Sequence, residues 1–169
     1  METTRHFVAT LYVVNDGATA LHRHPKLELR LPPGGHIDRD ELPHEAALRE
    51  TREETGLDPI LVRAGPTYES ETARTIPTPQ HLLLEDINVH PDGTVGHQHV
   101  DHVFFARVES REISPNGEDE VSADAWEWYD RAALREAELD EDVAELGIDA
   151  IETVERANDA EQADDERQA

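Results

Sequence analysis

Short stretches along the chain alternate hydrophobic and polar residues, which is the period expected of β-strands. Residues 6–14 are rich in aromatic and β-branched side chains, and the turn sequence Asn-Asp-Gly leads into a returning strand at 18–22. Further strands are predicted at 27–31, 60–63, 81–89 and 99–108. A polar segment at 66–79 predicts an irregular loop, and apolar positions within 131–158 predict one or two helices.

The clearest helical signal covers residues 43–55. A proline suits the first turn, alanines and leucine follow, and Gly56 stands where a helix commonly ends in a left-handed conformation. Successive side chains rotate by about 100° on a helix, so Glu50, Glu53 and Glu54 fall within roughly one quadrant. The helix therefore presents three carboxylates on one face.

Three carboxylates within one turn predict a metal site. Their repulsion costs a few tenths of a kcal/mol per pair in water, and a bound divalent cation would reverse it into attraction. Oxygen-only ligands favour Mg²⁺ (or Mn²⁺), and Mg²⁺ usually binds through one or two carboxylates together with substrate phosphates. The predicted substrate is thus a phosphoanhydride. The competing interpretation is a solvated acidic surface, since residues 140–142 and 164–166 are also acidic runs.

Residues 35–57 resemble a Nudix box. The pattern is Gly, five residues, Glu, seven residues, Arg-Glu, an apolar position, any residue, Glu-Glu, any residue, Gly and an apolar residue, and it departs only at Thr51. The resemblance implies a MutT-like Nudix hydrolase of the α/β class, folded as an α/β/α sandwich with a mixed β-sheet. It also implies that water attacks a phosphorus of a nucleoside diphosphate linked to another group, with divalent ions bound.

The resemblance assigns a role to each box position. The metal ligands would be the backbone carbonyl of Gly35 and the carboxylates of Glu50, Glu53 and Glu54. Arg49 would hold these carboxylates by ion pairing and support catalysis, and Glu41 would brace the loop against the helix. Thr51 puts a hydroxyl where the family packs an aliphatic side chain, so we expect a looser contact there.

The general base in several Nudix enzymes comes from a loop outside the box helix. Residues 126–129 resemble the Trp-containing strand that follows this loop, so the loop here would be 114–124. Distance from that strand favours Glu120 as the base, with Glu118 second and Glu53 of the box as the internal alternative. An exposed acidic loop is the other interpretation, because the alignment rests on loop length.

An anionic substrate also needs positive charge near the metal. The available cations are Arg23, Lys26, Arg30, Arg63 and Arg74. Arg30 directly precedes the Pro-Pro-Gly-Gly bend and is the first choice for a phosphate contact, and a surface arginine paired with a carboxylate is the alternative.

A histidine cluster lies in and beside a predicted strand. Alternation places His97, His99 and Asp101 on one face and His102 on the other, which argues against a zinc site made by all three imidazoles. A polar strand face or a contact to substrate phosphate are the remaining interpretations.

Composition restricts the classes of protein. The 169-residue chain has no cysteine, which excludes disulfides, thiolate zinc sites and the cysteine-dependent isoprenoid diphosphate isomerases of this fold. A net charge of −24 argues against nucleic-acid polymers as partners and resembles halophilic proteins, because molar salt shortens the Debye length to about 3 Å. We expect one domain over 1–158 and a frayed acidic tail over 159–169.

The predicted function is Mg²⁺-dependent hydrolysis of nucleoside triphosphates to release pyrophosphate. An ADP-ribose or nucleotide-sugar hydrolase is the alternative enzyme. A ligand-sensing Nudix module is the alternative of another class, although such modules commonly have degraded boxes. The apolar run at 7–14 is too short to span a bilayer, so we expect a cytoplasmic protein with a small nucleotide-type substrate and no membrane partner. Homodimerisation is left open.

Overall fold

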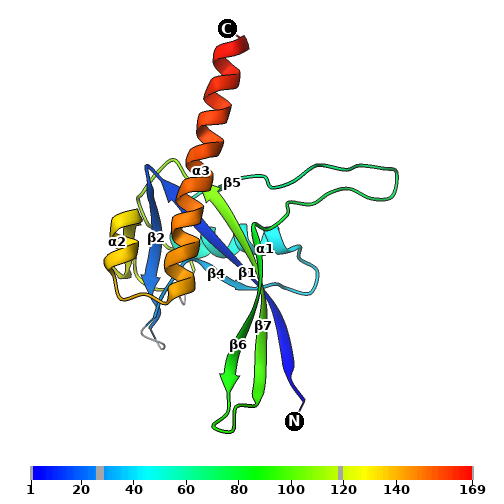
Figure 1. Ribbon diagram of the computed structural model, residues 1–169, viewed down its shortest axis with the longest axis vertical. Coiled ribbons are helices and arrows are strands. Elements are labelled where there is room, and N and C mark those ends of the chain that lie inside the picture. Colours follow the sequence, from blue (N-terminus) through cyan, green and yellow to red (C-terminus); the bar gives the residue numbers. More distant parts are fainter. Residues whose placement is uncertain (1, 26–28, 118–119, 169) are drawn as a thin grey trace.

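The computed structural model describes residues 2–25, 29–117 and 120–168, which form a mixed eight-stranded β-sheet with helices (Figure 1). The strands are β1 (Thr4–Asn15), β2 (Ala18–Arg23), β3 (Arg30–Leu31), β4 (Gly34–His36), β5 (Ile60–Leu61), β6 (His81–Val89), β7 (Val95–Arg107) and β8 (Trp126–Asp130). The helices are α1 (Pro43–Thr55), α2 (Arg131–Glu136) and α3 (Glu141–Gln168), with a short 3-10 turn at Ala123–Ala125.

Strand β1 is the centre of the sheet. It runs parallel to β7, and its other edge pairs antiparallel with β2 and β4. Strands β5 and β6 pair antiparallel with β7, and β8 pairs antiparallel with β2. The β1–β2 turn has positive φ at both Asp16 (45°) and Gly17 (75°), which is the conformation favoured by tight hairpins. The predicted mixed sheet is confirmed.

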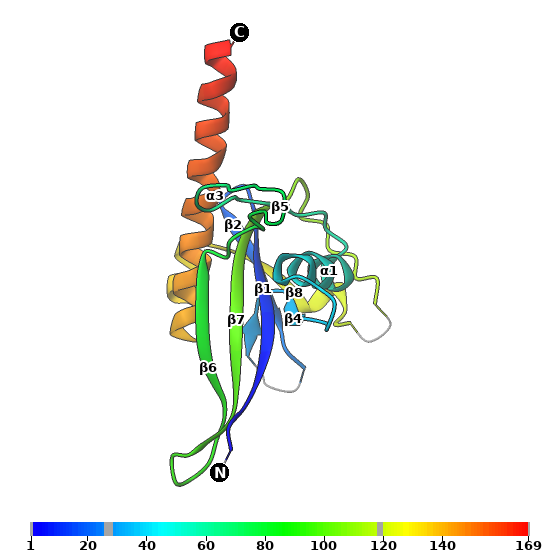
Figure 2. The same cartoon turned by 90° about the vertical axis from the view of Figure 1, so that its right-hand side faces the viewer.

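Helices cover both faces of the sheet, as Figure 2 shows for α1 and α3. Phe104 points toward α1, where it packs with Ala46 and Ala47. The next residue, Phe105, points toward α3 and packs with Ile151. Alternate residues of one strand thus feed two different cores, which is the α/β/α sandwich predicted from the sequence.

Two strands begin more than two residues from their predicted starts, and the other predicted strand bounds differ by two residues or fewer. The strand expected at 27–31 is a strand over Arg30–Leu31, and residues 26–28, which include Lys26, lie outside the described part of the chain. Strand β7 begins at Val95, four residues before the predicted start, because β6 and β7 form a long hairpin. Its polar first residues are held by backbone pairing to both β1 and β6, which needs no apolar alternation.

The acidic tail also differs from the expectation of fraying, since α3 continues to Gln168. Eight of the eleven residues at 159–169 are alanine, glutamate, glutamine or arginine, which are good helix formers, and the other three are aspartate. Arg107 binds Glu161, which ties the helix to β7 beyond its last buried residue, Val154. The remainder of the helix projects away from the sheet (Figure 1). Among the described residues, none of the helices could span a membrane.

Candidate metal centre and active site

Local sequence sets both ends of the helix that carries the carboxylates. Pro43 is its first residue, and Glu45 accepts a hydrogen bond from the backbone N–H of Leu42 at 2.9 Å. At the other end Gly56 adopts φ 71° and donates to the carbonyl of Arg52 at 2.9 Å. The predicted helix over 43–55 is confirmed at both ends, so the carboxylates share one face as expected.

Arg49 links the loop to the carboxylates. Its guanidinium makes two bonds to Glu41, Nε to Oε1 at 2.9 Å and Nη2 to Oε2 at 3.0 Å. Nη1 reaches Glu50 at 2.9 Å and Glu53 at 3.1 Å. Hydrogen bonding to Arg49 holds the pKa of Glu41 below its usual range. One arginine therefore holds three carboxylates in fixed positions, as the resemblance implies for Arg49 and Glu41.

Glu54 is the most perturbed carboxylate of the helix. Burial raises its pKa to about 8, and the nearby charges of Glu120 and Glu50 add to this effect, while a backbone hydrogen bond from Gly34 opposes it. Its Oε2 atom is buried and has no hydrogen-bond partner among the described residues. A buried carboxylate oxygen without a partner is stabilised by a cation, so Glu54 fits the role of a metal ligand.

Two glycines let strand β4 approach its neighbours closely, Gly35 against helix α1 and Gly34 against strand β1. A Cβ atom on Gly35 would lie 2.4 Å from Oε1 of Glu50, and one on Gly34 would lie 2.6 Å from the carbonyl oxygen of Ala9. Any side chain at Gly35 would therefore displace the Glu50 carboxylate. The four predicted ligands, Gly35, Glu50, Glu53 and Glu54, lie together on this loop and helix and offer only oxygen atoms, which suits Mg²⁺ or Mn²⁺.

The loop that follows β7 reaches the same place. Ser114 donates to the carbonyl of Thr55 and Asn116 to that of Glu53, both at 2.8 Å, so the loop is anchored to the end of α1. Glu120 is the largest charged contributor to the raised pKa of Glu54. The structure thus brings the predicted base to the box carboxylates. Glu118, the second candidate, lies outside the described residues.

Thr51, the one departure from the box pattern, is fully buried. Its hydroxyl donates to the carbonyl of Ala47 at 2.8 Å within the same helix. The polar group is therefore satisfied inside the helix, and the side chain is as buried as its neighbours Ala46 and Ala47. We expected a looser contact between the loop and the helix at this position, but the complete burial of Thr51 gives no sign of one.

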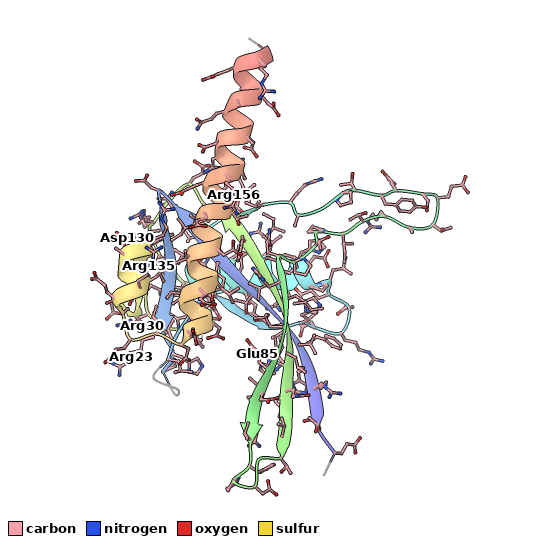
Figure 3. The ribbon with its side chains drawn as sticks, viewed as in Figure 1. Arg23, Arg30, Glu85, Asp130, Arg135 and Arg156 are labelled. Atoms are coloured by element: carbon pink, nitrogen blue, oxygen red, sulfur yellow. The ribbon has the colours of Figure 1, made fainter. Side chains whose placement is uncertain are left out.

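Arg30, the predicted phosphate contact, is not brought to the carboxylates. Its Nη1 binds Glu127 at 3.1 Å, and its guanidinium lies 5.7 Å from the ring centroid of Tyr129. Tyr129 packs in the core beneath α3, so Arg30 faces the side of the sheet opposite α1. Figure 3 shows Arg30 and Arg23 at the end of the sheet next to α2.

Two other predicted cations lie nearer to α1 or in solvent. The charge of Arg74 contributes to lowering the pKa of His44, in the first turn of α1, after the larger effect of burial. Arg63 is exposed. No pattern in the sequence pointed to His44, whose Nδ1 is buried and without a hydrogen-bond partner among the described residues.

The histidines of β7 divide between the two faces as alternation predicts. His97 and His99 lie on one face, where His6 of β1 and His36 of β4 join them. His102 points to the other face, with its Nδ1 3.1 Å from the carbonyl oxygen of Val8. The sequence pattern did not reveal His6 and His36, because they come from different strands.

Comparison with known proteins agrees with this geometry. The NUDIX domain family model matches residues 4–147. A Nudix-family hydrolase from Clostridium perfringens has a TM-score of 0.75 and 29% identity, over 89% of this chain and 99% of that chain.

Two more distant structures share the fold. An Ap4A hydrolase of C. elegans has a TM-score of 0.54 and 17% identity, covering 92% of this chain and 98% of its own. The dihydroneopterin triphosphate pyrophosphohydrolase of E. coli has a TM-score of 0.54 and 14% identity, covering 89% of this chain and 96% of its own. No curated protein sequence gave a match.

Proposed function

The chain belongs to the Nudix family, whose hydrolases act on nucleoside diphosphates linked to another group, and we propose that it is a divalent-metal-dependent pyrophosphohydrolase of nucleoside triphosphates. The observation that carries the proposal is the half-buried Glu54 side chain, whose pKa is raised and whose buried Oε2 atom has no partner among the described residues, beside the other box carboxylates. Without a bound cation, nothing would compensate the free-energy cost of burying a charged carboxylate here.

The proposed ligands are the Gly35 carbonyl and the carboxylates of Glu50, Glu53 and Glu54. When bound, Mg²⁺ or Mn²⁺ would offset the charge of the substrate phosphates and lower the pKa of the attacking water. Arg49 orients two of these carboxylates through one nitrogen, and Glu41 fixes Arg49 through two bonds. The protein therefore holds its ligands in place before the substrate arrives, which avoids reorganisation during the reaction.

The proposed general base is Glu120, which would accept the proton of the attacking water at a carboxylate oxygen. Its support is the anchored loop that brings its charge to Glu54. Glu120→Gln should lower turnover by ~10²-fold or more while changing Mg²⁺ affinity only a few fold. Unchanged turnover in this variant, together with a collapse in Glu53→Gln or Glu118→Gln, would move the role to that residue.

The substrate can be tested with one panel. Purified protein in molar KCl with Mg²⁺ or Mn²⁺ would be given nucleoside triphosphates, ADP-ribose, nucleotide sugars and dinucleotides, with and without added phosphatases. Nucleoside triphosphates should yield pyrophosphate, detected only after pyrophosphatase is added. Phosphate released from ADP-ribose or a nucleotide sugar only with alkaline phosphatase would favour the alternative hydrolases. Glu54→Gln is the control for contaminating activity, and silence across the panel would favour a ligand-sensing module.

We also propose that the protein works in concentrated salt in the cytoplasm, on a small-molecule substrate. The support is the net charge of −24, which would repel a nucleic-acid polymer and is best tolerated where salt screens it.

A further inference from the structure

We propose that His6, His36 and His99 form a second metal site, selective for a transition-metal ion such as Zn²⁺ or Ni²⁺. One imidazole nitrogen from each residue lies within 4.8 Å of the other two. The three come from β1, β4 and β7, and together they lie on the sheet face opposite α1. This site uses none of the proposed Mg²⁺ ligands.

Strand pairing explains why three residues far apart in the sequence meet. His6 pairs directly with His99 across the parallel β1–β7 register. Val8, two residues along β1, pairs with His36 of β4. Paired residues, and residues two apart on a strand, share a face of the sheet, so the backbone itself gathers the three imidazoles.

The spacing suits metal coordination. Nδ1 of His6 lies 3.1 Å from Nε2 of His36. Two nitrogens bound to one tetrahedral Zn²⁺ at 2.0–2.1 Å are separated by about 3.3 Å, so this pair is nearly in place. The ring of His99 lies 5.5 Å from that of His36, centroid to centroid, and its nitrogen lies within 4.8 Å of the other two, so the rings must rotate to bring all three nitrogens onto one ion.

The surroundings allow an ion to enter and be held. His6 and His36 are exposed and His99 is half-buried. Figure 2 shows that β1, β6 and β7 extend past both helices at the end where the N-terminus lies. His97 lies two residues from His99 on the same face, with its ring 4.7 Å from that of His6. It can supply a fourth ligand, or water can.

Ligand chemistry separates this site from the box. Imidazole nitrogen favours Zn²⁺, Ni²⁺ and Cu²⁺ over Mg²⁺, whereas the box offers only oxygen. One contact links the two, because Nη2 of Arg49 donates to the backbone carbonyl of His36 at 3.3 Å. The proposal itself does not depend on the proposed hydrolysis.

Competition titration tests the site in the full-length protein. Metal-free protein in molar KCl with millimolar Mg²⁺, which occupies the box and weak acidic sites, would compete with a chromophoric chelator for Zn²⁺. We expect one tightly bound equivalent, with affinity reduced ~10²-fold or more in His36→Gln and in His99→Gln. X-ray absorption of the Zn²⁺-loaded protein should show nitrogen ligands.

Two controls make the result specific. His102→Gln removes an imidazole from the same strand but the opposite face, and it should bind Zn²⁺ like the parent chain. Glu54→Gln should do the same, which distinguishes this site from the box. Circular dichroism would check that each variant is folded, and the exposed His6→Gln gives a further ligand variant. Equal affinity in the His36, His99 and parent proteins, or loss in His102→Gln of the same size, would overturn the proposal.

Discussion

Replacing Glu54 with glutamine should abolish most catalysis while stabilising the metal-free protein. The side chain keeps its size and helix propensity, but it loses the charge that binds the metal and that burial makes costly. We expect turnover to fall by at least ~10²-fold, the loss typical of removing one preorganised electrostatic group. The melting temperature without metal should rise.

The size of the rise follows from the pKa of Glu54, which is about 8 in the folded protein against an ordinary value of 4.5. Each pH unit corresponds to about 1.4 kcal/mol, so the upper limit is about 5 kcal/mol. Relaxation and water entry reduce such costs, and we expect about 1–3 kcal/mol. For a domain of this size that is a rise of roughly 3–10 °C.

The pH dependence of the melting temperature tests whether the charge of Glu54 causes the difference between the two proteins. The folded protein holds this proton more tightly than the unfolded chain, so the parent loses stability as pH rises from about 4.5 to about 8 and then stays at the lower level. Glutamine does not titrate. The two proteins should therefore melt at similar temperatures near pH 5, at the start of this range, and differ fully near pH 9, above it.

Thermal melts with a chelator in molar KCl would measure this, at both pH values and then with added Mg²⁺. Mg²⁺ should stabilise the parent much more than the variant. Glu53→Gln is the matched control, because its side chain is 45% exposed and should lose turnover with little gain in melting temperature. An equal rise for Glu54→Gln at both pH values would refute the buried charge as the cause.

Three further predictions concern the same region and the surface. Arg49→Lys cannot keep two bonds to Glu41, so turnover should fall ~10-fold or more in steady-state kinetics, with a melting temperature a few degrees lower. Gly35→Ala places a Cβ 2.4 Å from Glu50 Oε1, and calorimetric titration should show Mg²⁺ affinity reduced ~10-fold or more. Raising KCl from dilute buffer to molar concentration should raise the melting temperature by many degrees, since the net charge is −24; a flat or falling curve would contradict the halophilic interpretation.

Local signals predicted the helix and most strands. A proline at its start and Gly56 at its end fixed α1, and two-residue alternation located β1, β2 and β6. The early start of β7 could not be predicted in this way, because its first residues are polar and depend on pairing with neighbours. Helix propensity alone favours a helix that continues to Gln168. The prediction of a frayed tail depended on the high charge of this segment, and it was wrong.

The sequence indicated which residue types bind metal or phosphate, but not which face of the sheet each side chain occupies or which residues of different strands meet. The box spacing placed Glu50, Glu53 and Glu54 correctly because they share one helix. Arg30 precedes the box closely in sequence, but pairing among β2, β3 and β8 turns it to the other face, where Glu127 binds it. His36 meets the β7 histidines only through β1, a relation that spacing within one segment does not contain.

The parallel pairing of β1 with β7 also has a consequence for folding kinetics. Thr4 pairs with His97 and Val14 with Arg107, so the central contact of the sheet closes a very long loop. Such non-local pairing is slow, in the range of milliseconds to seconds for comparable topologies. During synthesis, the edge of β1 that will pair with β7 is still unpaired when α1 is complete at Thr55. It stays unpaired until the chain has grown to Arg107, the end of β7, and such an edge is a site for association with other chains. The yield of refolded protein should therefore fall as the protein concentration rises, even though every proposed box ligand precedes β7 in the chain.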